Sequence, residues 1–260
     1  MATPVVETAV HFYLSPHFDD AVFSCGGRVW TQGQAGDRVV VVTVFGGAPE
    51  AGATLSSYAQ DLQARWGEPI EAVEKRRAED GRALRPLGAV STHWPYLDCI
   101  YRQTSEGDSP YAGEEALWGK IDASDAEMIG ELGRRIAALP LGSDGRLYVP
   151  LGVGRHVDHR IVRQAAELSG HPLTYYEDFP YARDPGAVRA ALSHDRWEPE
   201  LVGLSEQALE AKAAAIACYS SQISTFWAGR DHMAASIRAF AEETGRGAPA
   251  ERYWRRVQHR

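Results

Sequence analysis

The stretch that decides the fold reads Leu14-Ser15-Pro16-His17-Phe18-Asp19-Asp20-Ala21. An apolar run that starts at Val10 leads into it, and apolar residues at helical spacing follow, so a buried strand passes into a helix here. In an open α/β sheet, ligands bind at this kind of position, beyond the carboxyl ends of the strands. Two interpretations compete: a site for metal binding and acid–base chemistry, or an aspartate that caps the helix. A cap needs one short polar side chain, which leaves His17 and the second aspartate unexplained.

The composition is that of an ordinary globular protein, with 260 residues of which 44% are hydrophobic and 24% charged. We expect a single domain over residues 1–260, because this length suits one larger α/β unit. The net charge of −8 and the lack of a basic block argue against nucleic acid or an anionic membrane as partner. The three cysteines (Cys25, Cys99 and Cys218) are far apart, which predicts small core residues in a reducing compartment. With no apolar run near the roughly 18 residues of a membrane helix and no signal-peptide pattern, we expect a cytoplasmic protein.

Strand and helix patterns alternate along the rest of the chain. Further strands are expected at 39–45, 90–93, 146–151 and 172–177, and at 196–204 as an edge strand. Helices are expected near 56–66, 69–86, 124–138, 205–219 and 232–243, and after residue 159. This alternation predicts a Rossmann-like three-layer α/β/α fold with a mostly parallel sheet of five or more strands in the order 3-2-1-4-5. Gly26 and Gly27 lie inside the first helix, where we expect a close approach to the sheet or to a ligand.

A second cluster follows the fourth strand and reads Gly152-Val153-Gly154-Arg155-His156-Val157-Asp158-His159. In the predicted order, strands one and four are neighbours, so both clusters should face one cleft. Two imidazoles and one carboxylate with an open position for water are the ligand set of catalytic zinc sites, and the same set suits Fe(II). The remaining carboxylate and histidine can then act as base and acid.

Other features have more ordinary interpretations. The glycines at 152 and 154 suggest a dinucleotide fingerprint, but the third glycine position is Val157, which argues against it. Asp98 follows a strand, where an aspartate in a turn is common. The charges of the 69–86 helix mostly indicate a solvated face.

Four motifs occur in order between residue 10 and about residue 225. They are Pro16-His17-Phe18-Asp19-Asp20 with Gly26-Gly27; Arg76, Glu79, Ala83, Leu87 and Gly88 in a helix; His156-Val157-Asp158-His159; and Lys212, Tyr219, Ser221 and Gln222. Together they resemble the motifs of the LmbE-like (PIG-L) zinc-dependent N-deacetylases. The resemblance implies a hydrolase that removes the acetyl group from an N-acetylated amino sugar of the N-acetylglucosamine type, or from its conjugate.

The resemblance also implies a role for each site residue. His17, Asp20 and His159 match the ligands of one Zn²⁺, and Asp19 matches the general base. The other matches are His156, which stabilises the oxyanion or protonates the leaving amine; Asp158, which orients His156; and Arg76 and Asp98, which contact the substrate.

One departure from the family pattern bears directly on the site. Some members carry a tyrosine that assists the oxyanion at the position of Gly154, so that help is absent here or comes from elsewhere, with Arg155 as a nearby candidate.

Several aromatic residues could stack on a sugar ring, although most should be core or rim: Trp94, Tyr96, Tyr175, Tyr176, Tyr181, Phe226 and Trp227. Two alternatives remain open, an Fe(II) enzyme that uses the same ligands and a non-catalytic sugar-binding relative. Intact Asp19 and His156 argue against the second, because a binder needs neither.

Overall fold

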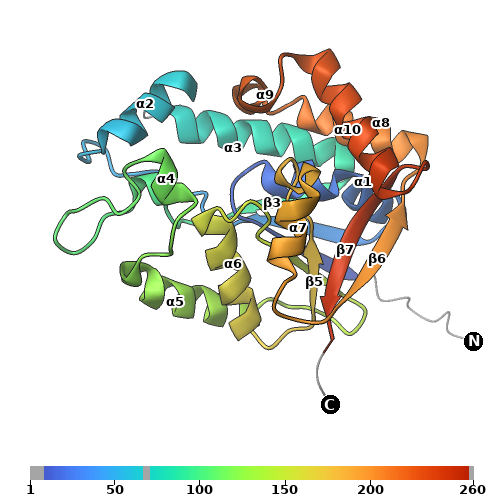
Figure 1. The fold of residues 1–260 in the computed structure, drawn as a ribbon, viewed down its shortest axis with the longest axis horizontal. Coiled ribbons are helices and arrows are strands. Elements are labelled where there is room, and N and C mark those ends of the chain that lie inside the picture. Colours follow the sequence, from blue (N-terminus) through green and yellow to red (C-terminus); the bar gives the residue numbers. More distant parts are fainter. Residues whose placement is uncertain (1–8, 67–70, 258–260) are drawn as a thin grey trace, which may run out of the picture.

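A seven-stranded sheet forms the centre of the computed structural model, which describes residues 9–66 and 71–257 (Figure 1). Its strands are β1 (Val10–Ser15), β2 (Arg38–Thr43), β3 (Ala89–His93), β4 (Leu147–Pro150), β5 (Leu173–Tyr176), β6 (Trp197–Gly203) and β7 (Ala250–Arg256). The order across the sheet is β3-β2-β1-β4-β5-β7-β6. The first five strands are parallel, and β7 is antiparallel to both β5 and β6. The expected run of five strands is therefore present, and β6 is the expected edge strand.

The sequence pattern does not predict β7, which lies between β5 and β6. Its residues read Ala-Glu-Arg-Tyr-Trp-Arg-Arg, and in such a charged segment the usual alternation of apolar and polar positions is hidden. The charged Glu251 points into the protein and is buried. Only a partner from elsewhere in the chain makes that burial favourable.

Ten α-helices connect and cover the strands within the described residues. They are α1 (Asp20–Gln34), α2 (Ser57–Trp66), α3 (Glu71–Leu84), α4 (Glu114–Leu117), α5 (Ala126–Ala137), α6 (Val157–Leu168), α7 (Pro185–Ala191), α8 (Glu206–Ile216), α9 (Ser220–Phe226) and α10 (Arg230–Thr244). Every helix expected from the sequence is present, although residues 69–70 of the 69–86 helix lie outside the described residues. The sequence did not predict α4, α7 and α9, because helices this short show little periodicity. Within the described chain, no helix is long and apolar enough to cross a membrane.

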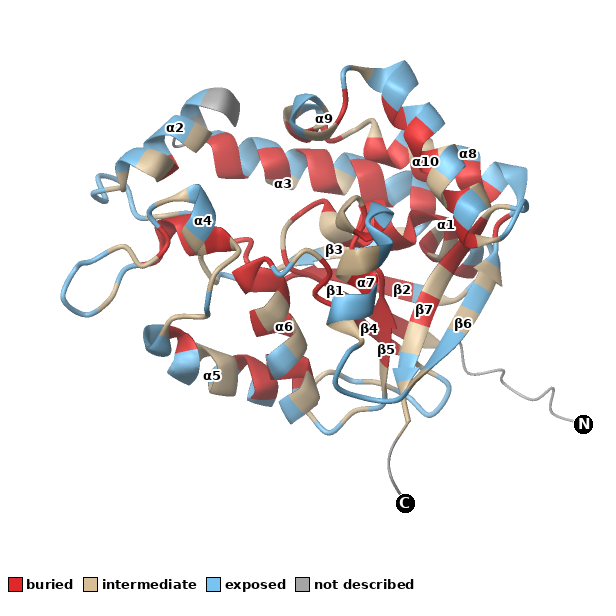
Figure 2. Ribbon diagram, viewed as in Figure 1, coloured by how far each residue is buried: buried red, intermediate tan, exposed pale blue. Residues whose placement is uncertain are grey.

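Helices pack on both faces of the sheet, so the core has two halves. Tyr13 and Val41 point into one apolar cluster with α1, α3 and α8, whereas Phe12 and Val40 point into the other with α5 and α6. In Figure 1, α3 and α8 lie toward the top and α5 and α6 toward the bottom. Buried residues run along the inner turns of α3 and α6 (Figure 2). The architecture is an α/β fold with a mixed, mostly parallel sheet.

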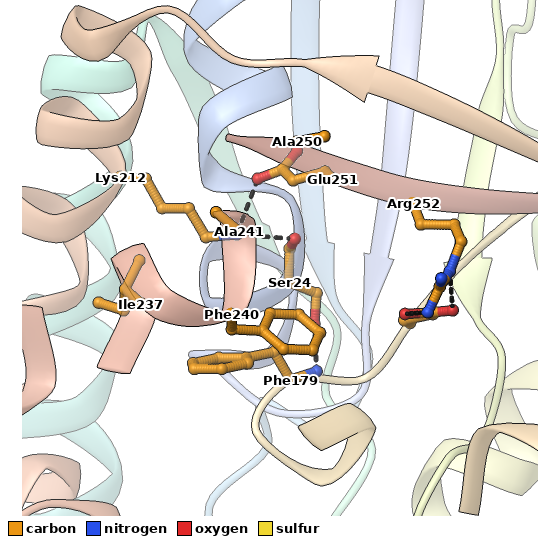
Figure 3. Close-up of a pocket in the computed structure, with 10 residues that line it drawn as sticks. Ser24, Phe179, Lys212, Ile237, Phe240, Ala241, Ala250, Glu251 and Arg252 are labelled. Carbon is orange, nitrogen blue, oxygen red and sulfur yellow. Dashed lines mark hydrogen bonds and ion pairs between the residues drawn. The ribbon is translucent and has the colours of Figure 1, made fainter. Parts of the chain in front are cut away.

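The two glycines inside α1 allow α8 and β7 to approach closely. A Cβ atom on Gly26 would lie 3.0 Å from Cγ of Lys212, and one on Gly27 would lie 2.7 Å from a methyl carbon of Leu204. Close approach was expected, but the partner at Gly26 is a helix, neither the sheet nor a ligand. Lys212 Nζ, buried in this gap, donates to Glu251 at 2.8 Å and to the carbonyl oxygen of Ser24 at 2.9 Å (Figure 3).

Candidate metal and catalytic site

The two predicted clusters meet at one edge of the sheet, because β1 and β4 are parallel neighbours. His17 precedes α1 and His156 precedes α6, so both histidines lie beyond the carboxyl ends of these strands. Their ring centroids are 5.0 Å apart, and those of His17 and His159 are 5.6 Å apart. The sheet order thus joins residues that are about 140 positions apart in the chain, as expected.

The aspartates at the start of α1 do not act as its cap. The hydroxyl of Ser15 accepts a hydrogen bond from the amide of Ala21 at 2.9 Å, which satisfies a free N–H of the first turn. Asp19 occupies the N-cap position, but its side chain makes no capping hydrogen bond. Asp20 accepts from the amide of His17 at 2.7 Å, outside the helix. Neither carboxylate is therefore explained as an ordinary helix cap.

Asp20 lies between the two histidines that the family resemblance assigns to the metal. Its oxygens lie 3.1 Å from Nδ1 of His17 and 3.3 Å from Nε2 of His159. Two ligand atoms bound at about 2.1 Å to a tetrahedral metal are about 3.4 Å apart, close to both distances. The nitrogens of His17, His159 and His156 also lie within 4.8 Å of one another, so an all-histidine ligand set is geometrically available as well.

A second carboxylate lies behind each of these histidines. Nε2 of His17 is 3.0 Å from Asp158, and Nδ1 of His159 is 2.7 Å from Asp178. Each ring thus faces a carboxylate at both nitrogens, and with its proton on the far nitrogen it presents the lone pair of the near nitrogen to a metal bound beside Asp20. This arrangement is typical of metal-ligating histidines. The sequence analysis did not assign Asp178 to the site. The one feature of the sequence that could have indicated it is its position after the end of a strand, which Asp19 and Asp158 share.

The electrostatics of the site favour a positive charge at its centre. Burial by itself lowers the pKa of His17, but Asp98, Asp158 and Asp20 outweigh it and raise the pKa well above the usual value. Burial likewise opposes protonation of His159, yet Asp20 and Asp178 raise its pKa to about 10. The surrounding carboxylates therefore stabilise a cation at this position.

His156 is held as a neutral imidazole with a defined tautomer. It is the N-cap residue of α6, and its Nδ1 accepts a hydrogen bond from the amide of Asp158 at 3.3 Å. The proton of the neutral ring is therefore on Nε2. Burial, together with the positive charge of His17, lowers the pKa of His156 to about 3. His156 can thus donate a hydrogen bond but is a poor source of a full proton.

The carboxylate of Asp158 binds several groups of the site, and the hydrogen bond between Asp158 and His156 is made by the main chain of Asp158. It contacts His17, the amide of Cys99 at 3.0 Å and the guanidinium of Arg102 at 2.8 Å, whereas His156 is contacted by the main-chain amide of Asp158. Burial opposes the charge on Asp158, but Arg102 and His17 outweigh it and keep its pKa far below the usual range. Arg102 was not predicted, because it lies in a polar loop with no motif around it.

Of the two predicted substrate residues, Arg76 lies next to the predicted base and Asp98 next to His17. Arg76 of α3 contacts Asp19 at 3.2 Å, and burial raises the pKa of Asp19 although Arg76 opposes this effect. Arg76 and Asp98 line the same small pocket, together with Phe18 and Tyr101. Asp98 also lies 3.5 Å from Nε2 of His17.

Among the aromatic candidates, most are core residues and one packs against the site. Tyr176 and Trp227 are buried in the apolar core. The ring of Tyr181 instead packs edge-on against His159, with ring centroids 5.9 Å apart. Arg155, the candidate beside Gly154, is exposed.

Comparison with known proteins agrees with this geometry. The model of the PIG-L family, described as GlcNAc-PI de-N-acetylase, matches residues 12–168. The chain belongs to this family. The match contains both histidine and carboxylate clusters, Arg76 and Asp98.

Two curated relatives and a solved structure are similar to the chain. It is 29% identical over 184 residues to a 2'-N-acetylparomamine deacetylase from Niallia circulans, covering 65% of this chain and 66% of that protein. It is 31% identical over 184 residues to a 2'-N-acetylparomamine deacetylase from Streptomyces fradiae, covering 67% of this chain and 58% of that protein. The chain therefore spans somewhat less than two thirds of the length of these relatives. The zinc-inhibited form of teicoplanin deacetylase Orf2 superimposes with a TM-score of 0.83 at 28% identity, covering 96% of this chain and 98% of that one.

Proposed function

We propose that the chain is a zinc-dependent hydrolase that removes the acetyl group from an N-acetylated amino sugar within a larger glycoconjugate. One observation carries the proposal. The near nitrogens of His17 and His159 converge on Asp20, each with a carboxylate behind its far nitrogen, and Asp19 lies next to this set with its carboxylate outside any helix cap. Such a ligand set leaves a coordination position open for water or substrate.

In this proposal, Nδ1 of His17, the carboxylate of Asp20 and Nε2 of His159 hold the metal. A zinc ion bound there supplies a water of pKa near 7 and polarises the acetyl carbonyl. His156 is left out of the ligand set, because its Nδ1 is engaged by an amide and its Nε2 carries a proton. Its N–H is then free to act on the substrate.

The residues of the chain divide the proton transfers between them. Asp19 takes a proton from the attacking water while Arg76 holds its carboxylate in place. The neutral His156 donates a hydrogen bond from Nε2 to the carbonyl oxygen as negative charge develops there. The proton for the leaving amine comes from Asp19, which acquired it from the attacking water. The products are acetate and the free amine.

The names of the relatives narrow the substrate class. The curated relatives are deacetylases of 2'-N-acetylparomamine, and the similar structure is a teicoplanin deacetylase. Both kinds of molecule carry an amino sugar on a larger scaffold. In this proposal Asp98 accepts hydrogen bonds from sugar hydroxyls and Arg76 contacts the substrate beside the base.

Acetate release tests this function. Purified protein is stripped with a chelator, reloaded with Zn²⁺ or with Fe²⁺ under anaerobic conditions, and incubated with N-acetylglucosamine, 2'-N-acetylparomamine and an N-acetylglucosaminyl glycopeptide. We expect the zinc-loaded protein to release acetate from at least one conjugate and the stripped protein to release none. Tight binding without acetate release would support a sugar-binding relative instead. Oxygen consumption by the Fe²⁺-loaded protein would support redox chemistry.

A further inference from the structure

Tyr181 projects an aromatic ring into the site from a part of the chain that none of the motifs covers. It opens a 3₁₀ turn, Tyr181–Arg183, that follows β5. Its ring packs edge-on against the ring of Trp118, 5.4 Å away, as well as against His159. His156 contacts the same two neighbours, with ring centroids 5.1 Å from Trp118 and 5.4 Å from His159. Tyr181 and His156 thus pack around the same pair of rings.

Gly154 makes room for this tyrosine. A Cβ atom at position 154 would lie 2.8 Å from Cγ and 2.9 Å from Cβ of Tyr181, which is closer than real Cβ contacts allow. The φ angle of Gly154 is +84°, in the left-handed region that favours glycine. The space that a side chain at position 154 would need is therefore occupied by Tyr181.

The hydroxyl of Tyr181 is available for a ligand. Among the described residues, none forms a hydrogen bond with it, whereas the buried hydroxyls of Tyr176 and Tyr219 bind the carbonyl of Leu14 and the carboxylate of Asp80. Tyr181 is only half-buried, so its hydroxyl lacks a protein partner without being enclosed by the core. A phenol hydroxyl has an ordinary pKa of about 10 and is protonated at neutral pH. The group therefore stays protonated and can serve as a donor.

We propose that Tyr181 is a catalytic residue, whose hydroxyl donates a hydrogen bond to the carbonyl oxygen of the substrate as that oxygen becomes negatively charged. It acts as a second donor beside Nε2 of His156. This inference rests on the proposed deacetylation, because only amide hydrolysis creates the oxyanion in question. Two donors from different loops would then hold the oxyanion on the side of the site that His159 and Trp118 define.

Tyr181→Phe tests the inference, because it removes the hydroxyl and keeps the ring. With one oxyanion donor lost, we expect kcat to fall about 10²-fold while KM and the zinc content stay near wild type. Calorimetry supplies a readout besides turnover. A phosphonamidate analogue of the substrate, which imitates the tetrahedral state, should bind the variant more weakly by a similar factor, whereas the amine product should bind equally well.

Two further variants serve as controls. Tyr175→Phe removes a hydroxyl that binds Glu167, and should leave kcat unchanged. Gly154→Ala displaces Tyr181, so it should lower kcat in the wild-type background and add little to Tyr181→Phe. Turnover of Tyr181→Phe within twofold of wild type, or unchanged affinity for the analogue, would overturn the assignment of Tyr181 alone. If the wild-type chain releases no acetate, the proposed function and the assignment of Tyr181 both fail.

Discussion

Two buried clusters of charge lie along helix α1, and they differ in which polar groups are left without a partner in the protein. Beside the middle of α1, Lys212 of α8 binds Glu251 of β7 and the carbonyl of Ser24. Glu251 also accepts from the amides of Gly27 and Arg28 and from the hydroxyl of Tyr253. This ion pair has all its partners within the protein. At the start of the same helix, Asp19 and the near nitrogens of two histidines face a common space. Both clusters bury charge. The cluster at the start of α1 differs in that its polar groups are available to a ligand.

The charge balance of the two clusters differs in the same way. Lys212 and Glu251 neutralise each other, which a buried pair requires. The cluster at the start of α1 sets two guanidinium groups, Arg76 and Arg102, against five carboxylates, those of Asp19, Asp20, Asp98, Asp158 and Asp178. The raised pKa values of His17 and His159 reflect this excess of carboxylates. This excess of negative charge calls for a cation, as a bound divalent metal would provide.

The largest effect is expected at Asp19. Asp19→Asn keeps the shape of the side chain but removes the base, so turnover should fall by about 10²- to 10⁴-fold. Because Asp19 is not among the proposed ligands, zinc content and thermal stability should stay near wild type. Asp20→Asn is the matched control, and it should lose zinc as well as activity. Near-normal turnover of Asp19→Asn on a substrate that the wild type cleaves would disprove its role as base.

Removing one partner of the Lys212–Glu251 ion pair should lower the stability of the fold and leave the catalytic activity intact. Lys212→Met leaves Glu251 buried without its cation, which should lower the free energy of unfolding by about 3–5 kcal/mol. Urea denaturation measures this loss, and turnover per folded molecule should be unchanged. Adding Glu251→Gln removes the stranded charge and should restore part of the stability. A loss of under about 1 kcal/mol in the single variant would show that the pair is not structurally important.

The smallest effect is expected at His11. This buried histidine differs from those of the site because both of its ring nitrogens contact groups of the protein outside the site. Its Nδ1 accepts from the amide of Arg146 at 3.2 Å, and its Nε2 lies 3.3 Å from Asp37. Burial lowers the pKa of His11 although Asp37 opposes this. Since the folded pKa lies below the unfolded value of about 6.5, His11 should stabilise the fold above that pH and lose this contribution as the pH falls below it.

His11→Gln should flatten the corresponding part of the pH profile. One such group changes the free energy of unfolding by at most about 1.4 kcal/mol per pH unit. Urea denaturation at pH 7.5, 6.5 and 5.5 should therefore show a smaller loss of stability in the variant than in the wild type. Parallel losses in the two proteins would assign the effect to other groups.

The sequence by itself determined the framework and the residues at the two strand ends. The apolar runs before His17 and before Gly152 mark buried strands, and the helical spacing after them places the polar residues at the carboxyl ends of those strands. Parallel connectivity then brings the two clusters together. These predictions succeed because they depend on the local periodicity of short segments and on one general rule of topology.

Only the tertiary structure decided which partners complete the site. Asp178 lies behind His159, Arg102 holds Asp158, and Tyr181 fills the space beside Gly154. Glu251 pairs with Lys212 in a strand that the sequence pattern hides. Each of these contacts joins residues from different loops or elements, and each residue type is common in loops. Neither periodicity nor spacing records such contacts, because they arise only when packing brings distant segments within a few ångströms.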